Sequence, residues 1–331
     1  MNNKKLISLI LSAALIAVLP FSLVACSAPA GNGAVSKEAT AASNADSSKK
    51  SDAGTSEKPL VYTTFYPVYD LTKRIVGDKM NVKMLIKTSE EPHDFELKAS
   101  DMQDLLKADL IVYNGAGMEN FIPTLKNSMK KDERFLDLSQ GLTLLENKSD
   151  LDDGKHEAVN PHTWLSVKNA MEQLDTIYRK ISSIDHQNND YYKANLEKSL
   201  KEFKALDEKF TTELGKIKKK DKYFIVSHAA FNYLANDYGL KQIAVTGISP
   251  EDEPTAAQLK KIADFVKQHG IKTILFEGKA TPKVAKTLAD NTGAKTGTIY
   301  TLENLTPEET ELGYIKLMEL NLQTLATVLA E

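Results

Sequence analysis

The segment Asn188–Lys219, NNDYYKANLEKSLKEFKALDEKFTTELGKIKK, sets the architecture of this 331-residue chain. It contains no proline, and its apolar residues recur three and four positions apart: Tyr192, Leu196, Leu200, Phe203, Leu206, Phe210, Leu214 and Ile217. This spacing predicts an amphipathic helix with one continuous apolar stripe. At 1.5 Å per residue the helix would be about 45 Å long. A helix of that length can pack along two neighbouring units.

Short β-rich runs alternate with helical patterns on both sides of this segment, which predicts parallel sheets flanked by helices. Before it, strands are expected at 60–65, 82–86 and 110–113, and helices at 67–76, 99–107, 118–130 and from just after Trp164 to Ile184. After it, strands are expected at 223–226, 242–245, 273–276 and 296–299, and helices at 255–269, 282–291 and 309–329. The predicted fold class is therefore α/β. It consists of an N-terminal lobe (59–184), a linking helix (185–220) and a C-terminal lobe (221–331), each lobe being a small, mostly parallel sheet with flanking helices.

The N-terminus has the pattern of an export signal. Lys4 and Lys5 precede an apolar run, Leu6–Leu19, which is too short for an ordinary membrane span. Leu23-Val24-Ala25-Cys26 then resembles a bacterial lipobox, so we expect a signal peptide at 1–25 and lipidation of Cys26. An uncleaved signal anchor is the alternative. Because Cys26 is the only cysteine, no disulfide and no thiolate ligand is available downstream.

Residues 26–58 are rich in Ser, Ala, Gly and Lys and have almost no large apolar side chain, so they cannot bury enough surface to fold. A flexible tether with a reach of about 30 Å is expected. The formal net charge is −3, and removing Lys4 and Lys5 with the signal would change it to −5. No basic stripe suggests nucleic-acid binding.

Three of the six histidines lie at or beside the ends of apolar runs. They stand in Pro92-His93-Asp94-Phe95-Glu96, Asn160-Pro161-His162-Thr163-Trp164 and Ser227-His228-Ala229-Ala230-Phe231. His228 directly follows a predicted buried strand, and open α/β sheets bind ligands at the carboxyl ends of their strands. Zinc prefers imidazole, thiolate and carboxylate ligands. Since thiolate is excluded, three imidazoles and one carboxylate form the natural ligand set.

Together with residues 248–255, ISPEDEPT, these segments resemble the zinc- and manganese-binding solute-binding lipoproteins of ABC transporters, and among them the zinc-uptake type. The resemblance covers essentially the whole mature chain. It implies two α/β lobes joined by one long helix, with the metal in the cleft between the lobes. It also implies a monomer on the extracytoplasmic face of a bacterial membrane, which captures zinc and delivers it to a permease and its ATPase.

The resemblance implies that His93 and His162 are ligands from the N-terminal lobe and His228 is one from the C-terminal lobe. Manganese-specific relatives usually carry a carboxylate in place of His228, so the imidazole favours Zn²⁺, with Mn²⁺ as the alternative. The family's fourth ligand is an acid after the last strand, here Glu303. Glu277 is the competing ligand, or else a hydrogen-bond partner near the cleft.

Other polar residues near these segments have weaker predictions. Asp94 and Glu96 either orient His93 or are surface charges. His156 stands in a short acidic loop. We expect this loop to be solvated and not to recruit metal. His186 is expected at a helix start and His269 at a helix end.

Two other classes of function remain as alternatives. A zinc hydrolase needs an open coordination position and a general base. This hypothesis would be favoured again if neither Glu303 nor Glu277 bound the metal. No His-Glu-x-x-His pattern is present, and no enzyme activity is predicted. A surface adhesin would bind matrix proteins even after the loss of all three cleft histidines.

Overall fold

The computed structural model describes residues 57–147, 151, 159–277 and 282–331. Residues 55–331 form one compact unit, which contains two four-stranded sheets. The predicted signal peptide, Cys26, nearly all of the tether and His156 lie outside the described residues. Within the described ranges, no helix combines the length and the hydropathy required to cross a bilayer.

Both sheets are parallel throughout and have the same topology. The N-terminal sheet has the order β2-β1-β3-β4, and the C-terminal sheet has the order β6-β5-β7-β8. The strands are β1 Leu60–Thr63, β2 Asn81–Met84, β3 Leu110–Tyr113, β4 Phe135–Asp137, β5 Tyr223–Val226, β6 Lys241–Ala244, β7 Thr273–Phe276 and β8 Lys295–Thr298. Because the strands are parallel, all loops that follow them leave from one edge of each sheet.

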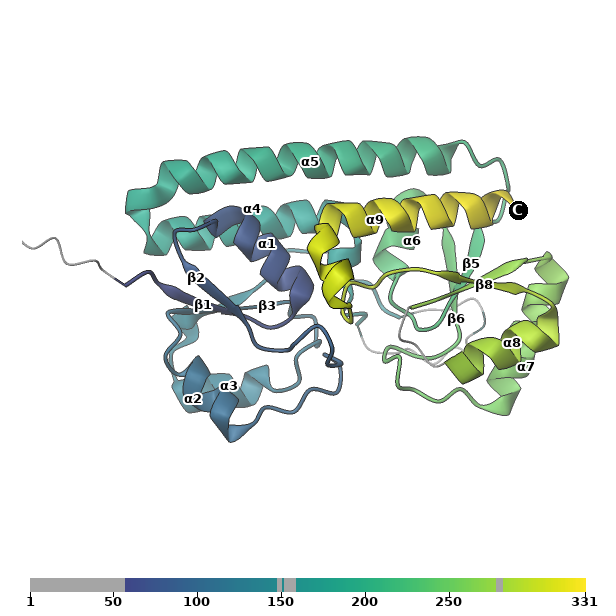
Figure 1. Cartoon of the computed structure of the whole chain (residues 1–331), viewed down its shortest axis with the longest axis horizontal. Helices are drawn as coiled ribbons and strands as arrows, with labels where there is room; N and C mark the ends of the chain where they lie inside the picture. Colours follow the sequence, from purple (N-terminus) through teal and green to yellow (C-terminus); the bar gives the residue numbers. More distant parts are fainter. Residues whose placement is uncertain (1–56, 148–150, 152–158, 278–281) are drawn as a thin grey trace, which may run out of the picture. The chain divides into compact units, whose positions relative to one another are not determined.

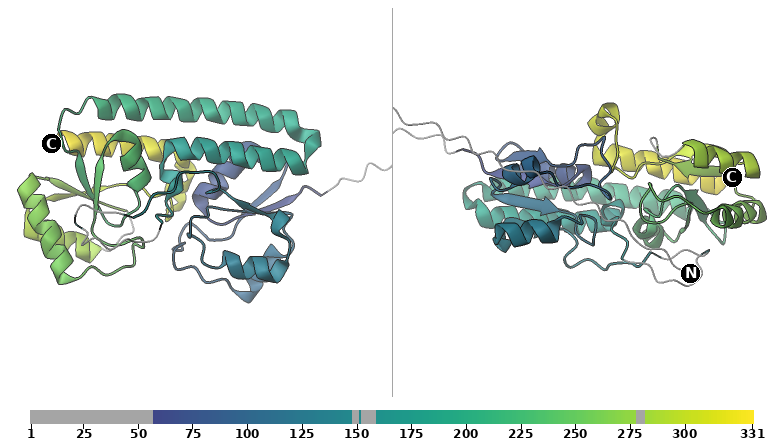
Figure 2. Two further views of the ribbon diagram at one scale, coloured as in Figure 1. Left: turned by 180° about the vertical axis from the view of Figure 1, so that it is seen from behind. Right: turned by 90° about the horizontal axis from the view of Figure 1, so that it is seen from below.

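Helices cover the sheets, and the longest of them extends past both lobes (Figures 1 and 2). The helices are α1 Tyr66–Val76, α2 Ala99–Leu105, α3 Ile122–Met129, α4 Val167–Ile184, α5 Asn189–Gly215, α6 Asn232–Tyr238, α7 Ala256–His269, α8 Pro282–Thr292 and α9 Pro307–Ala330, with the 3₁₀ turns η1 Asp132–Arg134, η2 Thr163–Leu165 and η3 His186–Asn188. In Figure 1 and in the left view of Figure 2, α5 forms the outermost layer, over α4 on one side and α9 on the other. The predicted α/β class, with two lobes and a long joining helix, is confirmed.

The apolar stripe of α5 explains how one helix serves both lobes. Phe203 is buried and stacks on Tyr314 of α9, with ring centroids 5.0 Å apart. The Arg74 guanidinium of α1 lies over the Phe203 ring, 5.5 Å from its centroid. Phe210 stacks on Tyr238 of α6 at 4.9 Å. One buried apolar cluster therefore continues from the N-terminal lobe through α5 into the C-terminal lobe.

The sequence predicted most elements to within a few residues, and its errors have local causes. It missed β4, which has three residues, and α6, which has seven, because both are too short for a clear period. Helix α5 ends at Gly215, four residues before the predicted end, where glycine disfavours further helix. The break at Gly313 inside α9 (φ 78°, ψ 164°) was also missed.

The role of α5 can be tested by removing Phe203. Phe203→Ala leaves a cavity between α1, α5 and α9, and we expect the free energy of unfolding of the metal-free protein to fall by about 3–5 kcal/mol. Lys204→Ala, at the exposed neighbouring position, should change it by less than about 0.5 kcal/mol. Urea denaturation measures both, and equal effects would contradict the proposed packing.

Candidate metal centre

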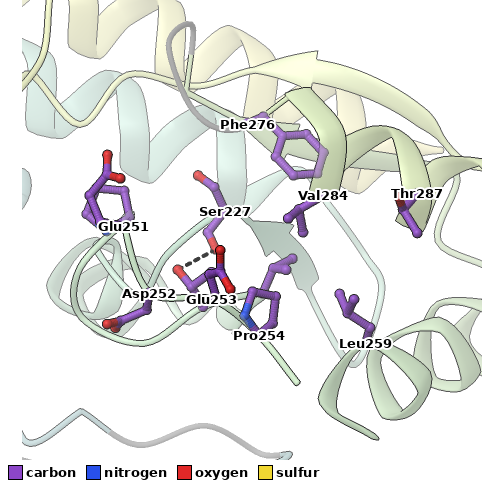
Figure 3. A pocket seen from close by; sticks show the side chains of 12 residues that line it. Ser227, Glu251, Asp252, Glu253, Pro254, Leu259, Phe276, Val284 and Thr287 are labelled. Carbon is purple, nitrogen blue, oxygen red and sulfur yellow. Dashed lines mark hydrogen bonds between the residues drawn. The ribbon is translucent and has the colours of Figure 1, made fainter. Parts of the chain in front are cut away.

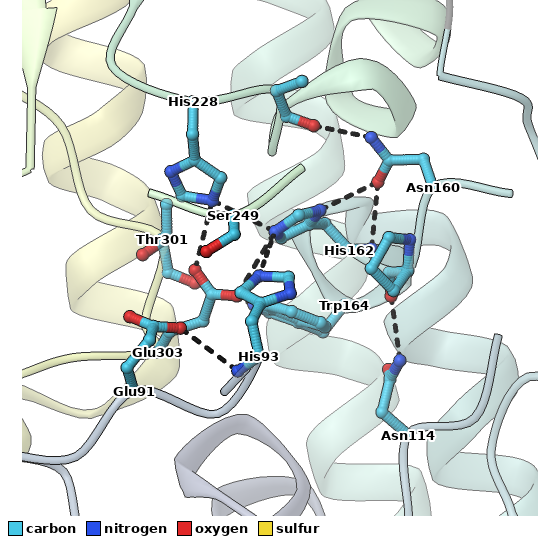
Figure 4. Close-up of polar contacts among 12 residues, drawn as sticks. Glu91, His93, Asn114, Asn160, His162, Trp164, His228, Ser249, Thr301 and Glu303 are labelled. Atoms are coloured by element: carbon cyan, nitrogen blue, oxygen red, sulfur yellow. Dashed lines mark hydrogen bonds and ion pairs between the residues drawn. The ribbon is translucent and has the colours of Figure 1, made fainter. Parts of the chain in front are cut away.

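Four side chains from separate loops converge on one point between the lobes (Figure 4). His93 lies in the loop after β2, His162 directly before η2, His228 two residues after β5, and Glu303 in the loop between β8 and α9. One potential ligand atom from each lies within 4.8 Å of the others. In the described part of the chain, no other group of this kind is found.

The separations of these atoms match those of ligands around a single small cation. The Nε2 atom of His162 is 3.1 Å from Nε2 of His93 and 3.1 Å from Nε2 of His228. Glu303 Oε1 is 3.1 Å from the His93 nitrogen and 3.2 Å from that of His162, and Oε2 is 3.5 Å from that of His228. Zinc–nitrogen bonds of 2.0–2.1 Å in a tetrahedron place the ligand atoms about 3.3 Å apart.

Glu303 is the most unusual group in the cluster. Its side chain is 1% exposed, and neither carboxylate oxygen accepts a hydrogen bond from the described residues. Burial alone would raise the pKa of Glu303, but the three imidazoles, His162 first, hold that pKa well below its usual range. A buried anion without hydrogen bonds is costly, so this arrangement suits a cation at its centre.

Hydrogen bonds at the other ring nitrogens orient two of the imidazoles. Asn160 Oδ1 lies 2.9 Å from Nδ1 of His162 and also accepts its backbone N–H at 3.0 Å. Glu277 Oε1 lies 2.7 Å from Nδ1 of His228. With Nδ1 occupied in each ring, Nε2 faces the centre, which is the usual arrangement of metal-binding histidines. The structure thus places Glu277 as a partner of His228, outside the four-residue group.

Asn160 also connects the two lobes. Its amide Nδ2 donates to the carbonyl of Ala229, next to His228, at 2.5 Å, and its carbonyl accepts from the hydroxyl of Tyr233 at 2.8 Å. This connection gives no signal in the sequence, because it joins residues 69 positions apart.

The loop after β3 supports His162 from the other side. Asn114 donates through Nδ2 to the Pro161 carbonyl at 2.8 Å and accepts from the Thr163 hydroxyl at 2.7 Å. Its own backbone N–H is held by the buried Glu119 carboxylate at 2.7 Å. Burial raises the pKa of Glu119 to about 7. Asn114 and Glu119 are therefore supporting residues that the sequence reading did not identify.

His93 has the most exposed ring of the three histidines. Its side chain is 8% exposed, against 0% for His162 and His228. It faces a hollow of about 610 Å³ between the lobes, lined in part by Asp94, Asn120, Pro161 and Ser249. Of the four residues of the cluster, only His93 lines this hollow.

Of the two roles predicted for Asp94 and Glu96, the structure agrees with surface charges, because both side chains are exposed. Asp94 accepts a hydrogen bond from Ser249 of the other lobe at 3.4 Å, and no contact between His93 and Asp94 or Glu96 side chains is seen among the described residues. Glu91 instead accepts the backbone N–H of His93 at 3.3 Å. Burial, together with the nearby Glu303 carboxylate, raises the pKa of Glu91 to about 7.

The other described histidines lie apart from the centre. His186 begins η3, and His269 ends α7 with its ring stacked on Phe265 at a centroid distance of 4.1 Å. Both positions agree with the sequence prediction.

A second hollow, of about 350 Å³, lies beside Ser227 (Figure 3). Apolar side chains such as Phe276 and Leu259 line one part of it, and the acids of residues 251–253 line another. Ser227 donates a short hydrogen bond to Glu277, which connects this wall to His228. These acids do not converge as the four residues of the candidate centre do.

Two parallel α/β lobes that bring three imidazoles and a carboxylate to one point define a metal-binding protein of the two-lobed solute-binding class. The chain belongs to the family of the zinc-uptake complex component A, periplasmic (ZnuA), whose model matches residues 61–328. The resemblance inferred from the histidine segments is thereby confirmed.

Individual relatives agree with this assignment. The high-affinity zinc uptake system protein ZnuA of Bacillus subtilis (strain 168) is 41% identical over an alignment of 299 residues, which covers 86% of this chain and 92% of that protein. The zinc-binding lipoprotein AdcA of Streptococcus pneumoniae is 38% identical over an alignment of 275 residues, which covers 80% of this chain and 54% of AdcA. The Zn(II)-bound ZnuA-like domain of S. pneumoniae AdcA superposes with a TM-score of 0.71 at 35% identity, covering 83% of this chain and 100% of that domain.

The role of Glu277 can be tested by its removal. Glu277→Ala frees Nδ1 of His228, so the imidazole loses its fixed orientation, and we expect zinc affinity to fall by about 10–100-fold. Glu251→Ala, which removes an exposed acid of a neighbouring loop, should leave the affinity unchanged. Competition with a fluorescent chelator measures both, and a normal affinity in Glu277→Ala would contradict the orienting role.

Proposed function

We propose that this protein is the extracytoplasmic zinc-binding component of an ABC transporter for zinc uptake, with His93, His162, His228 and Glu303 as the zinc ligands. The observation that carries the proposal is the buried Glu303 carboxylate, which faces three imidazole Nε2 atoms at 3.1–3.5 Å. Membership of the zinc-uptake family supports the same cargo.

Capture is favoured over catalysis by the number of protein ligands. Catalytic zinc sites usually have three protein ligands and a bound water, whereas four protein ligands close the coordination sphere. The proposed ligand set gives the fourth position to Glu303, which leaves no position for a reactive water. The protein therefore binds zinc as cargo, and it is not an enzyme.

The donor set also favours zinc over manganese. Three imidazole nitrogens and one carboxylate suit Zn²⁺, while Mn²⁺ is a harder cation that prefers more oxygen ligands. Zinc capture is followed by transfer to a membrane permease driven by an ATPase. A lipid on Cys26 keeps the protein, as a monomer, at the extracytoplasmic face of the membrane, with residues 26–58 as a tether of about 30 Å.

Metal content and affinity test the ligand set directly. We expect about one zinc per chain, and a preference for zinc over manganese. His228→Ala and Glu303→Ala should each weaken zinc binding by more than the 10–100-fold that accompanies loss of an outer hydrogen bond. Unchanged zinc affinity in Glu303→Ala would mean that Glu277 or water is the fourth ligand. A preference for manganese would contradict zinc as the transported metal.

The pH dependence follows from the protons that zinc must displace. Burial alone would lower the pKa of His228, but Glu277 and Glu303 raise it to about 10, whereas burial lowers the pKa of His162 to about 3. At neutral pH the metal-free protein therefore carries a proton on His228, and zinc must displace it. Affinity should fall as pH falls, by about tenfold per pH unit for one displaced proton.

Calorimetric titrations in buffers of different ionisation enthalpy count the protons released. About one proton per zinc near pH 7 is expected, and Glu277→Gln should release fewer because the pKa of His228 is no longer raised by that carboxylate. An affinity that stays constant between mildly acidic and neutral pH would contradict the proposed ligands.

A further inference from the structure

The loop that carries Glu303 leaves the C-terminal sheet and reaches across to the N-terminal lobe. After β8, two hydrogen bonds join the side chain of Asn321, on α9, to the backbone of Tyr300, at 2.8 and 2.7 Å. We call residues 303–312 the strap. It lies between Leu302 and Gly313, which both have positive φ, at 65° and 78°.

Hydrogen bonds join the strap to the N-terminal lobe. The backbone N–H of Leu305 donates to the carbonyl of Thr88, in the loop that leads from β2 to His93, at 2.9 Å. The hydroxyl of Tyr66, on α1, donates to the carbonyl of Thr310 at 3.1 Å. These two bonds join the backbone just after Glu303 and the first turn of α9 to the N-terminal lobe.

The two ends of the strap are fixed in the same way. Trp164 donates through Nε1 to the Thr301 carbonyl at 2.8 Å, just before the strap. Just after it, the backbone N–H of Tyr314 lies 3.4 Å from Oδ1 of Asp70, also on α1. The Tyr314 hydroxyl also donates to the Trp164 carbonyl, so at least five hydrogen bonds join residues 66–164 to residues 301–314.

Gly313 makes this attachment compatible with the rest of α9. Its φ of 78° with ψ of 164° belongs to a region that is open essentially to glycine alone. The break lets the first turns of α9 lie against α1, while Tyr314 and the residues after it pack beside α5 (Figure 1).

We propose that Tyr66 is a positioning residue for Glu303, which acts through the strap to hold the carboxylate beside His93 and His162. This inference rests on the proposed zinc-binding function. Tyr66 does not touch the cluster itself. Its buried ring fixes the hydroxyl, and the hydroxyl fixes the carbonyl of Thr310, so three of the four zinc-facing side chains are secured to one lobe.

The rate of zinc dissociation tests this role in the full chain. Trp164 is the only tryptophan, and its ring centroid lies 5.2 Å from that of His162, so its fluorescence can report zinc loss to an excess of chelator in stopped flow. Tyr66→Phe keeps the buried ring and removes the hydroxyl, which donates to the Thr310 carbonyl and also lies 3.5 Å from Oδ1 of Asp70. Zinc dissociation should therefore accelerate by about two- to tenfold.

Tyr238→Phe is the matched control. It also removes one tyrosine hydroxyl from a partly buried hydrogen bond, to Asp207 at 2.8 Å, but between α6 and α5 and away from the strap. The zinc dissociation rate of this variant should equal that of the unmodified protein. An unchanged rate in Tyr66→Phe, or an equal acceleration in both variants, would overturn the proposal.

A double-mutant cycle separates positioning from general stability. In a Glu303→Gln background, Tyr66→Phe should cause no further acceleration, because the carboxylate that it positions is gone. The same acceleration in both backgrounds would show that Tyr66 acts independently of Glu303 and would contradict the inference. Failure of the zinc-binding function itself would be seen separately, as the absence of stoichiometric zinc binding by the unmodified chain.

Discussion

The structure depends on a buried carboxylate that faces three imidazole nitrogens. Glu303 is almost fully enclosed and its oxygens receive no hydrogen bond from the described residues. Such a charge is costly unless cationic partners surround it or a cation lies between the groups. The four loops that meet here must therefore be held firmly, since otherwise the carboxylate would move out into water.

The scaffold provides this firmness through ordinary features of α/β proteins. Parallel strands deliver the loops of His93 and His228 to the same edges of their sheets, and hydrogen bonds from Asn160 and Glu277 orient two of the rings. The continuous apolar cluster along α5 limits how far the two lobes can separate. With the proposed ligand set, a zinc ion meets four side chains that already lie close together, so little binding energy is spent on ordering them.

Much of this arrangement could be predicted from the sequence. The period of the α5 stripe and the alternation of strands and helices are local signals. The two lobes and their long joining helix could therefore be predicted from them. The three histidines stood out because each follows or precedes a recognisable element. The choice between Glu303 and Glu277 was harder, because both follow strands of one sheet and their order in space depends on how the loops turn.

What the sequence could not reveal are contacts between distant residues. The bond of Asn160 to Ala229, the support of His162 by Asn114 and the attachment of the strap to Tyr66 each join positions 47 or more residues apart. The positive φ of Leu302 is likewise a tertiary effect, since nothing about leucine favours it. These features determine where the Glu303 carboxylate points, although no local pattern encodes them.

The most direct test of the central claim is X-ray absorption spectroscopy at the zinc edge on the protein loaded with one equivalent of zinc. The account predicts four nitrogen and oxygen ligands at about 2.0–2.1 Å, three of them with the outer-shell scattering of imidazole, and no sulfur. In Glu303→Ala one oxygen ligand should be replaced or lost while the three imidazoles remain. Fewer than three imidazoles, or a first shell that does not change in Glu303→Ala, would contradict the account.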